Sequence, residues 1–241
     1  MPSYREASIS FGPPFTGTVK SLVVITSAVF LVTYLPAQFL NVQLPFLLFG
    51  LTPYAVTHHG YIWQLVTYLF LHGGWFHIIF NLFALWMFGY DLERAWGSRR
   101  FLFYFFLTGV GAGVFNVLLQ PSSPRITIGN SGAVYGILLA YGVLFPDRPI
   151  FLWFVIPIKA KWFVLVMGVI EFYSSLASNE SGVSHIAHLG GMLFGYLYLR
   201  GGRLGLDFRG QYQDWRRERL RRKFEIYVRK HDRKDPDRWV N

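Results

Sequence analysis

Long apolar runs, separated by short polar or glycine-rich segments, make up most of this chain. The longest uncharged stretch lies between Lys20 and Asp91, where no Asp, Glu, Lys or Arg occurs. A bilayer core about 30 Å thick is crossed by roughly 20 helical residues. The pattern therefore predicts six membrane-spanning helices, at about residues 20–41, 76–94, 100–119, 131–146, 159–177 and 183–200.

The segment 42–75 does not fit this pattern, although it carries no formal charge. Any long helix in it would be interrupted by Pro45, Pro53, Gly60, Gly73 and Gly74. It is nevertheless rich in Leu, Phe, Tyr and Trp. We expect a first external loop that contains short helices and lies partly in the outer leaflet, embedded in the membrane.

Composition supports the same class of protein. The chain is 53% hydrophobic and 15% charged, whereas soluble domains are roughly 25% charged. This indicates an all-α polytopic membrane protein. Because the chain has no cysteine, disulfides and thiolate metal sites are excluded. Residues 1–18 are polar and contain Pro13 and Pro14, so we expect no secretory signal peptide and a retained first span.

Basic residues fall on alternate segments between the predicted spans. Arg5 and Lys20 precede the first span, and three arginines separate the second span from the third. Arg148, Lys159 and Lys161 lie between the fourth and fifth spans. The positive-inside rule then predicts that both termini are cytoplasmic.

This arrangement gives three expected regions: a cytoplasmic N-terminal segment 1–19, a membrane domain 20–200 and a basic cytoplasmic tail 201–241. The tail contains thirteen Lys or Arg and seven Asp or Glu, a net charge of +6. Beside a membrane domain, such a tail indicates contact with anionic lipid at the bilayer surface rather than binding of nucleic acid.

Polar residues from three predicted spans are expected at one depth of the membrane. In the predicted topology the second, fourth and sixth spans all begin at the external face. His77 and Asn81 lie in the first turns of the second span, Ser131 begins the fourth, and His188 lies about one turn into the sixth. A random scatter of polar residues would not give this coincidence, so these four residues form a candidate site.

Glycines accompany the serine and the histidine. Gly132 and Gly136 follow the serine on the fourth span, and His188 shares a face of the sixth span with Gly191 and Gly195 at the spacing i, i+3, i+7. Small residues on facing membrane helices allow their backbones to approach closely. A short serine side chain needs this closeness to reach an imidazole.

The candidate chemistry is acyl transfer. A serine becomes a nucleophile when an adjacent base takes its proton, and His188 is the first candidate base for Ser131. His185, a turn nearer the surface, is the second. Tyr135, four residues after Ser131, is expected to stack on the imidazole. No Asp or Glu lies near His188 in the sequence, so a Ser–His dyad is predicted rather than a triad.

An oxyanion formed in acyl transfer needs hydrogen-bond donors. The backbone N–H of Ser131, at a helix N-terminus, is one candidate. The side chains of His77 and Asn81, one helical turn apart, are two more. An alternative interpretation is that His77 and Asn81 only hold helices together.

Glu171 and a set of four histidines are further polar residues in apolar parts of the chain. Glu171, in the fifth span, is expected to be a protonated structural residue, with a role in gating as the alternative. A cluster of the histidines at positions 72, 77, 185 and 188 would offer ligands to Zn²⁺, but no carboxylate or thiolate is expected beside it. We therefore expect neither a metal nor a cofactor.

Three sequence motifs resemble those of the rhomboid intramembrane serine proteases. The stretch 70–82 ends in His77-x-x-x-Asn81, residues 129–136 contain Gly129-x-Ser131-Gly132, and residues 187–195 read Ala-His-x-x-Gly-x-x-x-Gly. The motifs occur in the family's order over about residues 60–200. The family's usual Trp-Arg pair in the first loop is replaced here by Trp63-Gln64.

The resemblance implies a six-helix bundle in which Ser131 is the nucleophile and His188 the general base and acid. It implies oxyanion stabilisation by His77, Asn81 and the Ser131 amide, with Tyr135 packed on the imidazole. The implied substrates are membrane-anchored proteins cleaved in or near their transmembrane segments, without a cofactor or metal.

Other membrane functions are less favoured by the sequence. It contains no His-Glu-x-x-His motif of metalloproteases and no pair of intramembrane aspartates. A rhomboid-like protein that only binds membrane segments would not need both Ser131 and His188, and a transporter is expected to show repeats and a midplane site. We expect an integral protein of a bacterial plasma membrane; its oligomeric state is not predicted.

Overall fold

The structure is a computed structural model of the whole chain, described here for residues 14–152, 155–177 and 184–201 and for residues 217, 219–221, 224, 225 and 227. The chain divides into two units, residues 1–202 and 203–241. The candidate site lies in the first unit. Most of the basic tail, and the loop before the sixth predicted span, lie outside the described residues.

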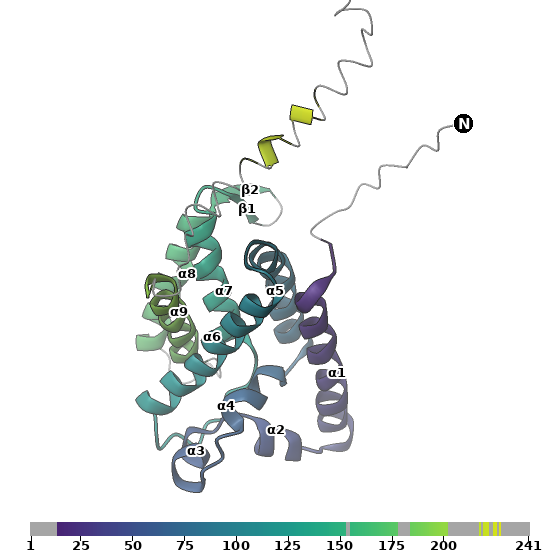
Figure 1. Cartoon of the computed structure of the whole chain (residues 1–241). Helices are drawn as coiled ribbons and strands as arrows, with labels where there is room; N and C mark the ends of the chain where they lie inside the picture. Colours follow the sequence, from purple (N-terminus) through teal and green to yellow (C-terminus); the bar gives the residue numbers. More distant parts are fainter. Residues whose placement is uncertain are drawn as a thin grey trace, which may run out of the picture. The chain divides into compact units, whose positions relative to one another are not determined.

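Six helices correspond in position to the predicted spans (Figure 1). They are α1 (Gly17–Leu40), α5 (Trp75–Trp96), α6 (Ser98–Leu119), α7 (Ser131–Leu144), α8 (Ala160–Ala177) and α9 (His185–Arg200). Within the described residues, α1, α5 and α6 are long and apolar enough to cross a membrane, and α7 is a shorter apolar helix. The mostly helical membrane fold is thus confirmed, whereas the count of six spans and the orientation of the termini stay predictions.

Helix α7 lies at the centre of the helical bundle. It packs against α5, α6, α8 and α9, and ten of its fourteen residues are buried. Glycine and alanine at five of these buried positions (132, 133, 136, 140 and 142) leave room for the neighbouring helices. A residue at the start of α7 is therefore held by several elements at once.

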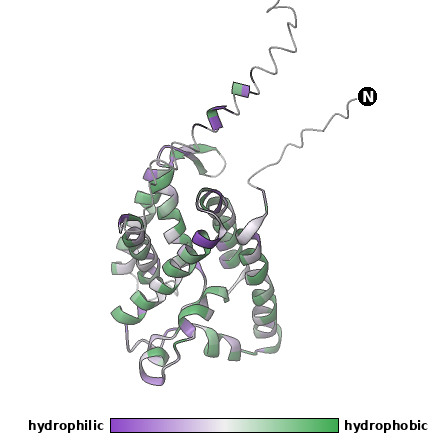
Figure 2. Ribbon diagram, viewed as in Figure 1, coloured by the Kyte–Doolittle hydropathy of each residue, from purple (hydrophilic) through white to green (hydrophobic). Residues whose placement is uncertain are grey.

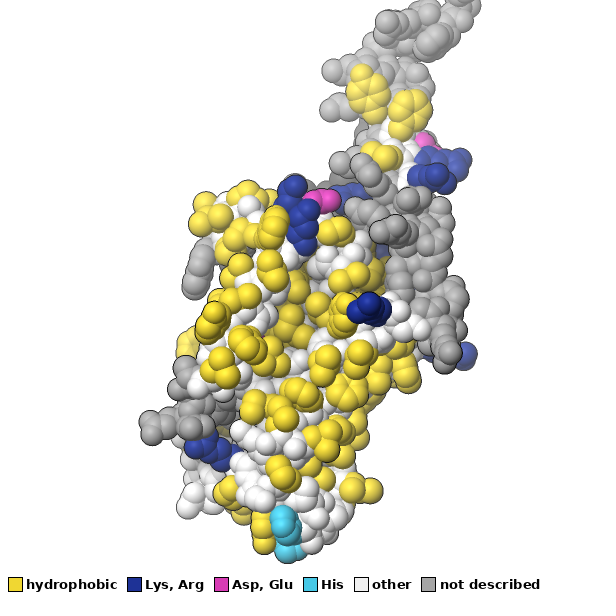
Figure 3. Space-filling view, turned by 90° about the vertical axis from the view of Figure 1, so that its left-hand side faces the viewer, with side chains coloured by type: hydrophobic (Ala, Val, Ile, Leu, Met, Phe, Trp, Pro, Cys, Tyr) yellow, Lys and Arg dark blue, Asp and Glu magenta, His cyan; other side chains and the backbone are white. Residues whose placement is uncertain are grey.

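Hydrophobic side chains also face outward, as expected for helices surrounded by lipid. Figure 2 shows apolar residues around the outer helices, and Figure 3 shows one face on which hydrophobic side chains predominate. The exposed large residues of α8 include Trp162, Leu165, Val166, Val169 and Ile170. A soluble protein would expose far fewer apolar side chains on one helix.

The segment between α1 and α5 forms short helices, as predicted: α2 (Leu44–Phe49), α3 (Pro53–His59), α4 (Gln64–Thr67) and the 3₁₀-helix η1 (Tyr68–Phe70). An isolated bridge between Leu51 and Thr127 joins this loop to the segment that precedes α7. The loop is therefore attached to the start of the central helix.

Gln64 fixes this loop from within. Its side chain is fully buried. Its Nε2 donates to the carbonyl oxygens of Leu47 and Leu48 at 3.3 Å, and its Oε1 accepts from the Thr52 N–H at 2.9 Å. Trp63 Nε1 also donates to the Leu48 carbonyl, at 3.0 Å. The side chains of Trp63 and Gln64 thus satisfy carbonyl groups at the C-terminal end of α2.

The all-α prediction is wrong in one detail. Strands β1 (Pro149–Leu152) and β2 (Ile156–Lys159) form an antiparallel hairpin between α7 and α8. It lies at the opposite end of the bundle from α2 and α3 (Figure 1). Paired in this way, the two short strands satisfy each other's backbone hydrogen-bonding groups.

Candidate active site

Ser131 is the first residue of α7, and its hydroxyl meets a histidine from α9. The Ser131 Oγ lies 2.7 Å from Nε2 of His188, whose side chain is buried. The two residues are 57 positions apart in the chain, so this contact depends on the packing of α7 against α9. A serine hydroxyl within hydrogen-bond distance of an imidazole is the arrangement of a nucleophile and its base.

Tyr135 covers one face of the His188 imidazole. The two ring centroids are 4.4 Å apart and the planes are inclined by 14°, which is a stacked arrangement. Because Tyr135 lies one turn after Ser131 on α7, the same helix presents both the hydroxyl and the stacking ring. The imidazole is thereby restricted in tilt as well as in position.

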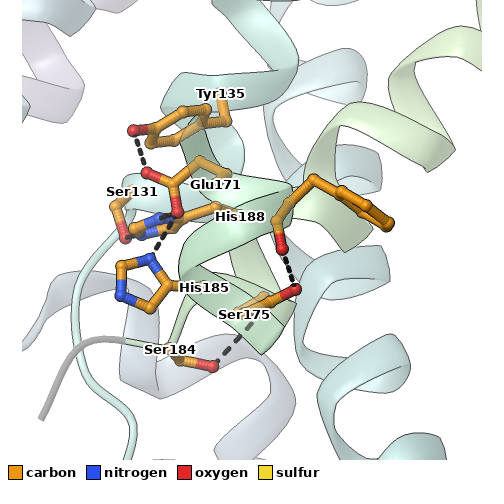
Figure 4. A network of polar contacts seen from close by, with 9 residues as sticks. Ser131, Tyr135, Glu171, Ser175, Ser184, His185 and His188 are labelled. Carbon is orange, nitrogen blue, oxygen red and sulfur yellow. Dashed lines mark hydrogen bonds and ion pairs between the residues drawn. The ribbon is translucent and has the colours of Figure 1, made fainter. Parts of the chain in front are cut away.

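A carboxylate that is distant from His188 in the sequence lies on the far edge of the same ring. Glu171 Oε2, from α8, is 3.0 Å from Nδ1 of His188 and 2.6 Å from Nδ1 of His185. Its Oε1 accepts a hydrogen bond from the Tyr135 hydroxyl. Figure 4 shows Ser131, Tyr135, Glu171, His185 and His188 in one cluster. The expectation that no acidic residue reaches His188 is therefore wrong.

The predicted depth of Glu171 in the membrane is the feature of the sequence that could have indicated its position beside the dyad. Glu171 lies near the predicted external end of the fifth span, the same level as Ser131 and His188. Sequence proximity to His188 was the wrong criterion, because α8 approaches the histidine through space. Glu171 is only 5% exposed, as expected for an ionisable residue of a membrane helix that points into the bundle.

The His188 contact with Glu171 differs from its contact with Ser131. Among the described residues, Nδ1 of His188 has no directed hydrogen-bond partner, although the carboxylate oxygen is only 3.0 Å away. The carboxylate thus lies close to the ring without an aligned hydrogen bond to Nδ1. Oε2 of Glu171 forms its shorter, directed hydrogen bond with Nδ1 of His185.

His77 of α5 lies beside the segment that leads into Ser131, and Asn81 lies one turn further along the same helix. Gly129 has a φ of +105°, and a Cβ on it would lie 2.6 Å from Nε2 of His77. Asn81 Nδ2 donates to the His77 carbonyl at 2.9 Å. Among the described residues neither side chain bonds Ser131 directly, so the structure brings them next to the site rather than into contact with the hydroxyl.

The four histidines of the predicted cluster form two separate pairs. His72 packs edge-on against His77 with centroids 4.9 Å apart, and His185 packs edge-on against His188 with centroids 6.1 Å apart. Burial, and secondarily His77, lowers the pKa of His72 to about 3. Within the described part of the chain, Glu171, His185 and His188 are one group whose ligand atoms lie within 4.8 Å of one another. The contacts of the two histidines with the carboxylate, at 2.6 and 3.0 Å, lie within hydrogen-bond range.

Comparison with known proteins identifies the family. A sequence model of the Rhomboid domain matches residues 59–202, more than half of the chain. The chain belongs to the rhomboid family. The match begins in the first loop and includes α5 to α9, so it covers every residue of the candidate site.

Named rhomboid relatives are similar to this chain over much of its length. Rhomboid-like protease 5 of Toxoplasma gondii is 34% identical over 149 residues, which are 59% of this chain and 16% of the relative. Rhomboid protein 1, mitochondrial, of Saccharomyces cerevisiae is 28% identical over 202 residues, 77% of this chain and 55% of the relative. Rhomboid-like protein 11, chloroplastic, of Arabidopsis thaliana is 32% identical over 184 residues, 67% of this chain and 58% of the relative.

The chain spans less than two thirds of the length of each of these relatives. The family and the apolar helices indicate an integral membrane protein. Because the names of two relatives are mitochondrial and chloroplastic, the similarities do not favour the expected bacterial plasma membrane over another membrane.

Proposed function

We propose that this rhomboid is a serine endopeptidase that cleaves membrane-anchored proteins in or near their transmembrane segments. The observation that carries the proposal is the 2.7 Å contact between the Ser131 hydroxyl and Nε2 of His188. The contact lies between two helices of an apolar bundle and within the segment that matches the Rhomboid domain. A purely structural serine at the start of a helix would more simply accept a backbone N–H of that helix's first turn.

In the acylation step, His188 Nε2 takes the proton of Ser131 Oγ as that oxygen attacks the scissile carbonyl carbon. The C–O bond to the serine forms, and the carbonyl electrons move to the oxygen to give an oxyanion. When the intermediate collapses, the C–N bond breaks and the proton on Nε2 passes to the leaving amine. The products are an acyl-serine and the free amine of one fragment.

Stabilisation of the oxyanion is assigned to groups that surround the start of α7. The Ser131 N–H belongs to the first turn of a helix, where backbone donors have no partner in their own helix. The side chain of His77, beside Gly129, and that of Asn81, one turn further along α5, are the further donors proposed. These donors would act on the charge that develops in the transition state.

Deacylation repeats the sequence with water as the nucleophile. Nε2 of His188 takes a proton from water, and the resulting hydroxide oxygen bonds to the acyl carbon. The C–O bond to Ser131 then breaks, and the serine oxygen recovers the proton from Nε2. The second fragment leaves as a carboxylic acid, so no cofactor, metal or external co-reactant other than water is needed.

The substrates proposed are proteins that enter the site from the lipid. The exposed apolar faces of the outer helices fit contact with lipid and with a transmembrane segment. We further propose six spans, cytoplasmic termini and a tail 201–241 that contacts anionic lipid. A bacterial plasma membrane is the location proposed.

The proposal is tested with the purified full chain in liposomes that contain a single-span reporter protein. Ser131→Ala and His188→Ala should each abolish cleavage, because the nucleophile or its base is missing. Ser21→Ala and His59→Ala, at exposed positions of α1 and α3, should cleave as the wild type does. Cleavage by Ser131→Ala at the wild-type rate would reject Ser131 as the nucleophile. Absence of cleavage by the wild type would favour a rhomboid that only binds membrane segments.

A further inference from the structure

We propose that Glu171 is a positioning residue for His188, so that the site operates as a Ser131–His188–Glu171 arrangement rather than as an isolated dyad. This inference rests on the proposed function. Its structural basis is the placement of one buried carboxylate, from α8, on the edge of the imidazole opposite to the serine.

The His188 imidazole is held on three sides by three different residues. Its Nε2 lies 2.7 Å from Ser131 Oγ, its Nδ1 lies 3.0 Å from Glu171 Oε2, and its face lies 4.4 Å from the Tyr135 ring. Two of these groups come from α7 and one from α8, whereas His188 itself lies on α9 (Figure 4). A general base that must deliver its proton along one direction benefits from this restriction.

The carboxylate is itself fixed by other side chains. The Tyr135 hydroxyl donates to Oε1, and His185 Nδ1 lies 2.6 Å from Oε2. Among the described residues no Lys or Arg is paired with Glu171; its partners are a phenol and two imidazoles. Burying a carboxylate among apolar helices is costly unless it has such partners. This cost in folding free energy has a functional reason if the Glu171 charge stabilises the transition state of the reaction.

The effect of Glu171 is expected on the transition state. During acylation His188 gains a proton and a positive charge, and a carboxylate 3.0 Å from Nδ1 stabilises that charge more than it stabilises the neutral ring. Because no directed hydrogen bond joins Nδ1 to the carboxylate in the structure, the effect is smaller than in a serine triad with an aligned acid, where the loss is about 10⁴-fold. Removal of the charge should therefore lower kcat and leave KM nearly unchanged.

Tyr135 and His185 have separate roles in this arrangement. Tyr135 acts twice, since its ring stacks on His188 and its hydroxyl holds Glu171. His185 contacts Oε2 of Glu171, the same oxygen that lies near His188. This contact keeps the oxygen at the edge of the His188 ring. His185 is thus assigned to the carboxylate and not to the serine, which differs from its expected role as a second base.

The experiment compares Glu171→Gln with the wild type in the liposome cleavage assay. Glutamine keeps the size and an acceptor for Tyr135 but removes the charge. We expect kcat to fall by about 10- to 100-fold, KM to stay within about twofold, and labelling of Ser131 by a fluorophosphonate to slow in parallel with kcat. Glu93→Gln is the matched control: this buried carboxylate of α5 accepts the backbone N–H groups of Thr18 and Val19 and lies outside the proposed machinery. Its loss should lower thermal stability and leave kcat unchanged.

A second comparison separates positioning from general packing. In the His188→Ala background, Glu171→Gln should not change the residual rate of Ser131 labelling, because Glu171 acts through His188. Tyr135→Phe keeps the stacked ring and removes the hydrogen bond to Oε1 of Glu171, so it should lower kcat by a smaller factor than Glu171→Gln does. If Glu171→Gln does not fold, Tyr135→Phe takes its place as the test.

The outcomes distinguish this inference from the proposed function. If wild-type cleavage depends on Ser131 but kcat is unchanged in Glu171→Gln, or in Tyr135→Phe where the glutamine variant does not fold, the inference is overturned and the protease stands. The inference would also be overturned if Glu171→Gln slowed Ser131 labelling by the same factor in the wild-type and in the His188→Ala backgrounds. If the wild type does not cleave, the proposed function itself fails.

Discussion

Gly191 of α9 lies directly against Gly132 of α7. A Cβ built on Gly191 would be 1.9 Å from the Gly132 carbonyl oxygen and 2.7 Å from its carbonyl carbon, both of which are backbone atoms. No rotamer change can relieve such a clash. The two glycines therefore set how closely the helix of the serine approaches the helix of the histidine.

Gly191→Ala should separate α7 from α9 and lengthen the contact between Ser131 and His188. We expect a loss of stability at or above the upper end of the about 1–3 kcal/mol seen for overpacked cores, and a fall of at least about 100-fold in kcat/KM. Thermal unfolding in detergent and reporter cleavage measure the two effects. Gly74→Ala is the control, because no atom lies within 4 Å of a Cβ added there. Similar behaviour of the two variants would show that the close approach is unimportant.

Asn81→Ala tests the proposed oxyanion role of the α5 side chains. Removing one of several donors should lower kcat by about 10²-fold or less, since the Ser131 amide and His77 remain. The alternative is a purely structural role, because Asn81 Nδ2 donates to the His77 carbonyl of its own helix. In that case the variant would unfold at a lower temperature while kcat, measured well below that temperature, equals the wild-type value.

The sequence was sufficient to predict the positions of the main helices and the pairing of Ser131 with His188. Apolar length determines a membrane helix, and equal depth brings residues of different helices to one level. Depth does not determine which way a helix faces. The approach of Glu171 to His188 depends on the rotation of α8 about its axis, which is set by packing against α7 and α9.

Short elements were predicted less well than long ones, for a related reason. The hairpin of β1 and β2 has only four residues in each strand, too few for an alternating pattern to stand out from an apolar loop. The role of Gln64 was missed because a neutral amide carries no charge signal. Its bonds reach carbonyls 16 and 17 residues earlier in the chain, and only the folded loop brings these groups together.

Gln64→Ala should loosen the first loop without unfolding the helices. It removes the donors to the Leu47 and Leu48 carbonyls and the acceptor for the Thr52 N–H, all in part-buried bonds, and a group left buried without a partner costs about 1–3 kcal/mol. We expect faster hydrogen exchange over residues 44–52, with protection of α6 unchanged. Gln38→Ala, at an exposed position of α1, should leave exchange in the loop at the wild-type rate. Equal exchange in the two variants would contradict the assigned role of Gln64.

His72 makes the stability of the fold depend on pH. Burial lowers its pKa from 6.5 to about 3, so the folded protein holds this imidazole neutral while the unfolded chain protonates it below about pH 6.5. The unfolded state then binds the additional proton, and stability falls as the pH falls from about 6.5 towards 3, by at most about 1.4 kcal/mol per pH unit from this group. Thermal unfolding of the wild type and of His72→Gln, measured across this range, isolates the contribution. The curve of the variant should be flatter between pH 6.5 and 4, and curves of equal slope would show that His72 does not titrate on unfolding.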